Sequence, residues 1–229
     1  MAFEDHRSEN FVQRSLYSDQ IRRAFHQADS LRRHIAIYGL PGMGKSQLMY
    51  DYVKENNAKY LAVFATDASK LENIGASFNL FFEELGLPRC YEDDQGRRVK
   101  AVLQWLRRNA QWLLVFDNVQ EKDYNRLKQY IPQGDYGHVM MTTRSEWAGK
   151  TFGSGPGNLA LHVEEMQHDT AKELLLKSAL LQDREKRAQN HQTGFRPCSS
   201  PLARAFDHRV CGQGSPNRRS AYHDPRSLE

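Results

Sequence analysis

The sequence is poor in cysteine, because its 229 residues include three, Cys90, Cys198 and Cys211. An odd number at spacings that match no zinc motif supports neither a disulfide framework nor a zinc site. Long apolar runs are lacking too, and no window approaches the length that spans a bilayer. The first ten residues are charged and have no apolar core of a secretory leader. These absences predict a cytoplasmic protein with no membrane partner.

Most of the chain also lacks an excess of charge. Residues 1–182 contain 23 basic and 23 acidic side chains, whereas residues 183–229 contain nine and five. The whole net charge of +4 therefore lies in the C-terminal segment. A main body without a basic surplus does not indicate a nucleic-acid-binding surface, so nucleic acid is disfavoured as a partner.

What the chain does contain, from Phe11 to about Leu181, is an alternation of short apolar runs with longer helical patterns. The runs predict five strands, at His34–Tyr38, Tyr60–Thr66, Trp112–Asp117, Gly137–Thr142 and Leu159–Val163. Apolar residues at helical spacing predict helices within residues 48–53, 74–85 and 99–106, and a further helix at Asp169–Leu181. This alternation indicates an α/β fold with a mostly parallel sheet.

The segment after Gln182 shows neither strand nor helix periodicity and holds four of the eight prolines. It cannot bury enough apolar surface to offset its ordering entropy, so we predict a disordered basic tail over residues 183–229. An RNA- or partner-binding arm is the alternative. The predicted organisation is thus an N-terminal tail over residues 1–10, a folded domain over residues 11–182, and this tail.

A glycine-rich loop joins the first predicted strand to a predicted helix. It reads Gly39-Leu40-Pro41-Gly42-Met43-Gly44-Lys45-Ser46 and matches G-x-x-x-x-G-K-[ST]. The glycines let backbone N–H groups surround phosphate oxygens at a helix N-terminus. Lys45, which we expect to face the surface, can reach the β- and γ-phosphates, and Ser46 offers a hydroxyl to Mg²⁺. An ordinary turn with a solvated lysine, the alternative, does not account for the flanking strand and helix.

Two further strands end in residues that suit a phosphate site. Asp117 follows five apolar residues and so lies at the carboxyl edge of the sheet, where it would hold a water of the magnesium shell. Arg144 follows two threonines at the end of the next strand and can contact a terminal phosphate with two hydrogen bonds. The alternatives are a turn-capping role for Asp117 and a surface salt bridge for Arg144.

Together these motifs resemble the NB-ARC nucleotide-binding domain of the STAND class of signalling ATPases, the regulatory module of NOD-like receptors. The resemblance covers Phe11 to about Leu181, with Gly39–Ser46 as the Walker A loop, Leu113–Val119 as the Walker B strand and Val139–Arg144 as the sensor strand. It implies the three-layer α/β/α fold of P-loop NTPases, with a mostly parallel five-stranded sheet of order 2-3-4-1-5. The sensor strand would then lie between the other two.

The resemblance also implies the site and its cofactors, ATP or ADP with Mg²⁺. Phe11, Val12 and Arg14 are similar to the family's adenine-binding segment, and the loop together with Gln47 would bind the rest of the nucleotide. Lys45, Asp117 and Arg144 would take the catalytic roles, with Ser46 and Asp117 holding the metal. Guanine is disfavoured, because no Asn-Lys-x-Asp pattern occurs.

The sequence departs from the family pattern at several points. Gln13 stands where glycine is usual, and Asn118 stands where many members carry a second acidic residue. Because an amide is a poor general base, we expect slow hydrolysis at most, with Asp67 and Glu146 as alternative groups to activate water. The helical ARC region is not recognisable beyond a weak echo at Pro201–Asp207, and a shifted or truncated reading frame would also give such a tail.

The expected function is therefore that of an ATP/ADP-binding switch domain in a STAND or NOD-like signalling protein of innate immunity. Its expected partners are an adenine nucleotide and either further copies of the chain or full-length STAND relatives. Two alternatives stay open. One is a truncated interaction or decoy protein that pairs with full-length relatives without hydrolysis; the other is a small-molecule kinase, for which neither a phosphoacceptor site nor an arginine-bearing lid is recognisable.

Overall fold

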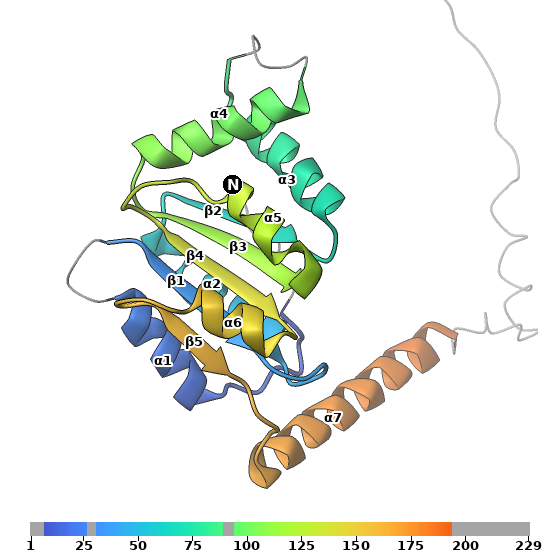
Figure 1. The fold of residues 1–229 in the computed structure, drawn as a ribbon. Helices are drawn as coiled ribbons and strands as arrows, with labels where there is room; N and C mark the ends of the chain where they lie inside the picture. The colour runs from blue at the N-terminus through green and yellow to red at the C-terminus, as the bar shows by residue number, and fades with distance from the viewer. Residues whose placement is uncertain (1–6, 27–30, 89–93, 194–229) are drawn as a thin grey trace, which may run out of the picture. The chain divides into compact units, whose positions relative to one another are not determined.

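A computed structural model describes residues 7–26, 31–88 and 94–193 of the chain, with side chains up to residue 180. Residues up to Leu181 belong to one compact unit, and Gln182 begins a second. Within the first unit, a single sheet separates two layers of helices (Figure 1). All three cysteines fall outside the described residues.

The sheet has five parallel strands in the order β2-β3-β4-β1-β5. They are β1 Arg33–Tyr38, β2 Ala62–Asp67, β3 Trp112–Val119, β4 His138–Thr143 and β5 Leu159–His162. Apolar residues dominate the central strands because helices cover both faces of a parallel sheet. The five predicted strands and the predicted strand order are confirmed, including the position of the sensor strand β4 between β1 and β3.

The helices divide between the two faces. On one face, α1 (Ser15–Phe25) and α2 (Lys45–Asn56) pack against the sheet. On the other lie α3 (Leu71–Glu84), α4 (Gln95–Arg108), the short α5 (Tyr124–Leu127) and α6 (Glu146–Phe152). Short 3₁₀ turns occupy Asn57–Lys59, Glu121–Asp123 and Lys128–Tyr130. The result is the predicted three-layer α/β/α fold.

Alternate strand residues supply the two cores. Ile35 and Val115 face α1 and α2, whereas Ala36 and Phe116 face the other helices. In α3, Phe78 is fully buried, and truncating such a side chain to alanine costs about 3–5 kcal/mol of stability. The two cores therefore hold the sheet in place, and with it the strand ends that form the site.

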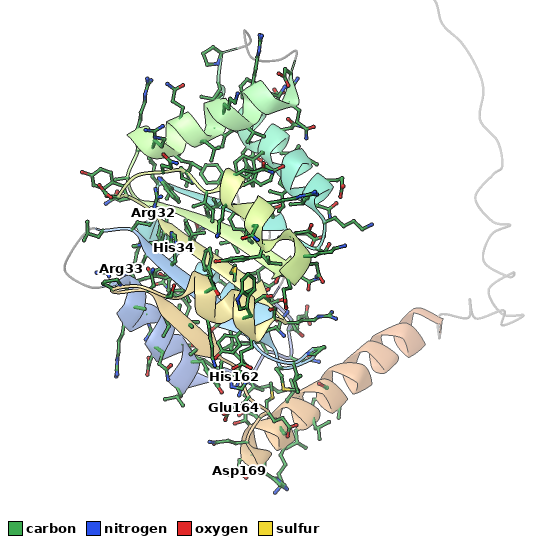
Figure 2. The ribbon with its side chains drawn as sticks, in the orientation of Figure 1. Arg32, Arg33, His34, His162, Glu164 and Asp169 are labelled. Atoms are coloured by element: carbon green, nitrogen blue, oxygen red, sulfur yellow. The ribbon has the colours of Figure 1, made fainter. Side chains whose placement is uncertain are left out.

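At the amino edge of the sheet, Arg32, Arg33 and His34 lie at the start of β1 (Figure 2). Burial, and then the charge of Arg32, lowers the pKa of His34 to about 4. Burial, and then the charge of His26, likewise lowers the pKa of His138 to about 4. One ring nitrogen of each is buried without a hydrogen-bond partner among the described residues. Both histidines are therefore held neutral in the fold.

Some elements differ from expectation. Helices α1, α5 and α6 were not predicted, and α7 (His168–Thr193) continues past Leu181, where the predicted helix ended. The rest of the predicted tail, residues 194–229, lies outside the described residues. Arg7 and Ser8, assigned to the N-terminal tail, contact α2 through Asp51 and Gln47. No helix in the described part of the chain is long and apolar enough to cross a membrane.

Candidate functional site

An open pocket of about 640 Å³ lies at the carboxyl edge of the sheet. The strands β3 and β4 end beside the loop that follows β1, because parallel strands bring their carboxyl ends to one edge. The pocket thereby joins part of the predicted glycine-rich loop to Asp117 and Arg144, whereas Gly39, Leu40 and Met43, which were also predicted to bind nucleotide, do not line it. Its lining is Pro41, Gly42, Gly44, Lys45, Ser46, Gln47, Tyr50, Asp67, Asp117, Asn118, Thr142, Thr143 and Arg144.

The loop needs its glycines for two different reasons. Gly39, Gly42 and Gly44 have φ angles of 145°, 80° and 85°, a region that other residues rarely adopt. At Gly39 a Cβ atom would also lie 2.5 Å from the carbonyl oxygen of Val163, whereas at Gly42 and Gly44 it would meet nothing within 4 Å. The loop is thus packed tightly against the chain after β5 at one end and open toward the pocket at the other. Helix α2 starts directly after Gly44, so its N-terminal N–H groups border the pocket.

Lys45 does not face the surface as expected, because the residue is only 8% exposed. Its ammonium group donates to the carbonyl oxygens of Gly39 and Leu40, at 2.9 and 2.7 Å. Burial and then the charge of Arg144 lower the pKa of Lys45, while Asp117 opposes this shift. The lysine therefore also supports the loop conformation, and two of its three N–H bonds are directed at the loop.

Asp117 is the centre of a hydroxyl network. Ser46 Oγ donates to Oδ1 of Asp117 at 2.7 Å, and the Thr142 hydroxyl donates to the same oxygen. The hydroxyl of Tyr50 donates to the other oxygen, Oδ2, at 3.0 Å. The end of β3 is thereby linked to the start of α2 and to the end of β4, which fixes the carboxylate beside the loop.

Asn118 interrupts the pairing of β3 with β4. Its φ of 65° places it in the left-handed region, and the strand register shifts between Phe116 and Val119. Asparagine tolerates this conformation better than most residues, and the Asn118 backbone N–H donates to Thr142 Oγ1 at 2.8 Å. The bulge turns Asn118 into the lining of the pocket next to Asp117.

Arg144 and Asp67 lie at the rim. Arg144 is exposed, and among the described residues no hydrogen bond or ion pair is formed by its guanidinium group. Burial alone would raise the pKa of Asp67, but hydrogen bonds from Ser69 and Asn73 lower it overall. Glu146, the other candidate to activate water, pairs with a lysine of its own helix α6 at 2.5 Å and does not line the pocket.

The predicted adenine segment does not line this pocket. Val12 is buried, and Phe11 borders a separate cavity of about 310 Å³ beside α2. The Arg14 guanidinium donates to the carbonyl oxygens of Met43 and Glu164, at 3.2 and 2.9 Å, and lies over the ring of Tyr17. Arg14 thus ties the segment to the loop from outside the pocket.

Sequence reasoning missed Tyr50 and Thr142 as members of the site. Tyr50 follows Ser46 by four residues, so its position on the same helix face was a signal available in the sequence. Thr142 lies within the quoted sensor motif, but strand alternation alone does not show which of two adjacent threonines faces Asp117. Contacts across three elements decide both assignments.

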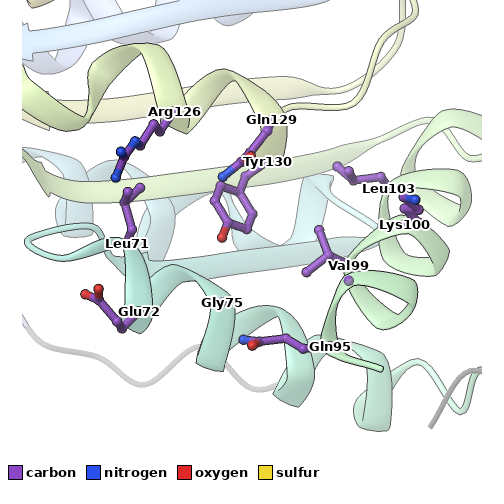
Figure 3. A pocket seen from close by; sticks show the side chains of 11 residues that line it. Leu71, Glu72, Gly75, Gln95, Val99, Lys100, Leu103, Arg126, Gln129 and Tyr130 are labelled. Carbon is purple, nitrogen blue, oxygen red and sulfur yellow. The ribbon is translucent and has the colours of Figure 1, made fainter. Parts of the chain in front are cut away.

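A second cavity of about 640 Å³ lies between α3, α4 and the α5 region (Figure 3). It includes the side chains of Leu71, Val99 and Tyr130, with Lys100 and Arg126 at its border. None of the predicted site residues lines it. We therefore take the pocket at the carboxyl edge of the sheet, which predicted site residues line, as the candidate functional site.

Fold and site together define a nucleotide-binding domain of the P-loop NTPase class. Within that class, residues 16–185 match the NB-ARC domain, and the chain belongs to this family of STAND-class P-loop ATPase domains. A comparison with curated proteins finds no match. The predicted family and fold are confirmed.

Solved structures show the same fold at low sequence identity. The Cdc6p structure from Pyrobaculum aerophilum is 12% identical, with a TM-score of 0.53 over 78% of this chain and 52% of its own. The Orc1 protein of Aeropyrum pernix, in a complex with DNA, is 13% identical, with a TM-score of 0.52 over 74% and 50%. The chain therefore spans about half the length of each, and the likeness concerns the fold alone.

The residues of the pocket fit a hydrated magnesium ion. The hydroxyl of Ser46, at the start of α2, and the carboxylate of Asp117, in β3, place two oxygen atoms 2.7 Å apart. Mg²⁺ prefers oxygen ligands, keeps several of its waters and uses one or two protein groups beside nucleotide phosphates. Such a site would take Ser46 as a direct ligand and Asp117 as an acceptor from a bound water.

Proposed function

We propose that this chain is an ATP- and ADP-binding switch domain of a STAND or NOD-like signalling protein, dependent on Mg²⁺ and slow in hydrolysis. One observation supports this above others: the Ser46–Asp117 hydrogen bond unites the loop and the Walker B strand in the pocket that Lys45 and Arg144 also line. This combination of groups suits a polyphosphate and its cation.

Different groups of the pocket would bind the phosphates and the metal ion. Backbone N–H groups at the start of α2 and the ammonium of Lys45 bind the β- and γ-phosphates. Arg144, exposed at the rim and without a described partner, is free to contact the terminal phosphate. Bound Mg²⁺ would neutralise phosphate charge, and Ser46 and Asp117 would hold it. ATP and ADP then differ in whether Arg144 is engaged, which is the differential contact that a switch requires.

Hydrolysis is proposed to be slow because the carboxylate of Asp117 already accepts hydrogen bonds from three hydroxyls. Its neighbour Asn118 is an amide, which cannot take a proton from water at neutral pH. The same amide favours the second candidate, a decoy that pairs with full-length relatives and binds nucleotide without turnover. Assembly into oligomers of this chain or with such relatives is part of both proposals.

The identity of the retained nucleotide tests the proposal. Purified chain is denatured, and the released nucleotide is separated by chromatography. Stoichiometric ADP or ATP is expected, because the glycine-rich loop would bind the phosphates of either nucleotide. Incubation of the emptied chain with ATP and Mg²⁺ then distinguishes the candidates, since the slow ATPase forms ADP and the decoy forms none. Retention of guanine nucleotide, or no binding of any nucleotide, would contradict both.

A further inference from the structure

Tyr50 is placed to act on the cation site. It lies one helical turn after Ser46 on α2, so both side chains border the pocket. Its hydroxyl donates to Oδ2 of Asp117 at 3.0 Å, while Ser46 and Thr142 donate to Oδ1. Helix α2 thus donates to both oxygens of the carboxylate, through Ser46 and Tyr50, and β4 adds a donor to Oδ1 through Thr142.

The three hydroxyls leave Asp117 little freedom. An ionised carboxylate offers about four acceptor positions, and three are occupied by Ser46, Thr142 and Tyr50. About one position remains for a water of the metal shell. A phenol is a donor at neutral pH, so the Tyr50 hydroxyl can supply this hydrogen bond.

We propose that Tyr50 is a positioning residue for the divalent cation. Its hydroxyl holds Oδ2 of Asp117, so that Oδ1 stays directed at Ser46. Removing this hydroxyl leaves Oδ2 without its donor in a pocket that contains the cations Lys45 and Arg144. Lys45 already interacts electrostatically with Asp117, so it is a competitor for the released oxygen. Pairing with lysine would draw the carboxylate away from the metal.

The test compares Tyr50→Phe with Tyr52→Phe in the full chain. Tyr52 is buried on the same helix, and its hydroxyl contacts that of Tyr60 at 2.7 Å. Tyr52→Phe therefore controls for the loss of a tyrosine hydroxyl from α2. ATP affinity is measured by isothermal titration with excess Mg²⁺ and again in EDTA. For Tyr50→Phe we expect about tenfold weaker binding in Mg²⁺ and unchanged binding in EDTA, as is typical when a group supporting a metal ligand is lost. Tyr52→Phe should change neither affinity.

Equal losses of affinity in Mg²⁺ and EDTA would overturn the proposal, because Tyr50 would then be only a structural support of α2. Unchanged binding in Mg²⁺ would overturn it as well. The inference rests on the proposed nucleotide site, and the wild-type chain separates the two failures. If the wild type binds ATP more tightly in Mg²⁺ than in EDTA and Tyr50→Phe behaves in the same way, only the role of Tyr50 is refuted. If the wild type binds no ATP, the proposed function itself is refuted.

Discussion

Replacing Arg144 with alanine should weaken binding of ATP much more than binding of ADP. Its guanidinium is exposed at the rim of the pocket, so the substitution breaks no hydrogen bond or ion pair among the described residues. A hydrogen bond between charged groups contributes about 1.5–3 kcal/mol, and exposure to solvent favours the lower end. About tenfold weaker ATP binding is therefore expected.

The effect on ADP should be small, because the diphosphate lacks the group that Arg144 contacts. Removal of Arg144 also removes its lowering effect on the pKa of Lys45, and this change applies to both nucleotides. Isothermal titration of ATP and ADP with Mg²⁺ measures the two affinities, and Arg126→Ala, at the cavity of Figure 3, serves as a control of equal charge change. Equal losses for ATP and ADP would refute the γ-phosphate contact.

Three further perturbations follow from the structure. Asn118→Asp, which suits the left-handed backbone, should raise phosphate release by about tenfold to a hundredfold, since it adds a general base; an unchanged rate means that water is activated elsewhere. Because the pKa of His34 is about 4 when folded and about 6.5 when unfolded, protonation favours unfolding, and stability should fall as pH drops from 6.5 toward 4. At pH 5 the loss of stability is about 2 kcal/mol. Thermal melts at pH 7 and pH 5 should show a smaller loss for His34→Phe, whereas the control His162→Phe, at an exposed site, should show the wild-type loss. Gly39→Ala should lower the melting temperature and ATP affinity together, because its Cβ would lie 2.5 Å from a backbone oxygen; a fully stable variant with normal affinity would show that the loop adapts.

The sheet could be predicted from sequence because its strands are short, apolar and separated by helical patterns. The run from Trp112 to Phe116, for example, is fully buried, as a central parallel strand must be. Helix α6 escaped prediction because it has seven residues and follows β4 directly, with Ser145 as its N-cap. A helix that short has too few turns for an apolar stripe to be recognised.

The chemical identity of the site residues was also predictable, whereas their contacts were not. The loop pattern singled out Lys45 and Ser46, but burial of Lys45 depends on the path of the loop carbonyls around its ammonium group. The left-handed backbone of Asn118 was hidden because asparagine occurs in both ordinary and left-handed conformations. The network around Asp117 required the register of three separate elements, which no local pattern specifies.

Loss of nucleotide binding in a folded Lys45→Ala variant tests the central claim most directly. Isothermal titration with ATP and Mg²⁺ is run on the wild type, on Lys45→Ala and on Lys100→Ala, a matched lysine at the other cavity. Circular dichroism and thermal melting must accompany it, because Lys45 also bonds to the loop carbonyls. We predict at least about a hundredfold weaker binding for Lys45→Ala and wild-type affinity for Lys100→Ala. Wild-type ATP affinity in a folded Lys45→Ala variant would show that the loop is not the nucleotide site.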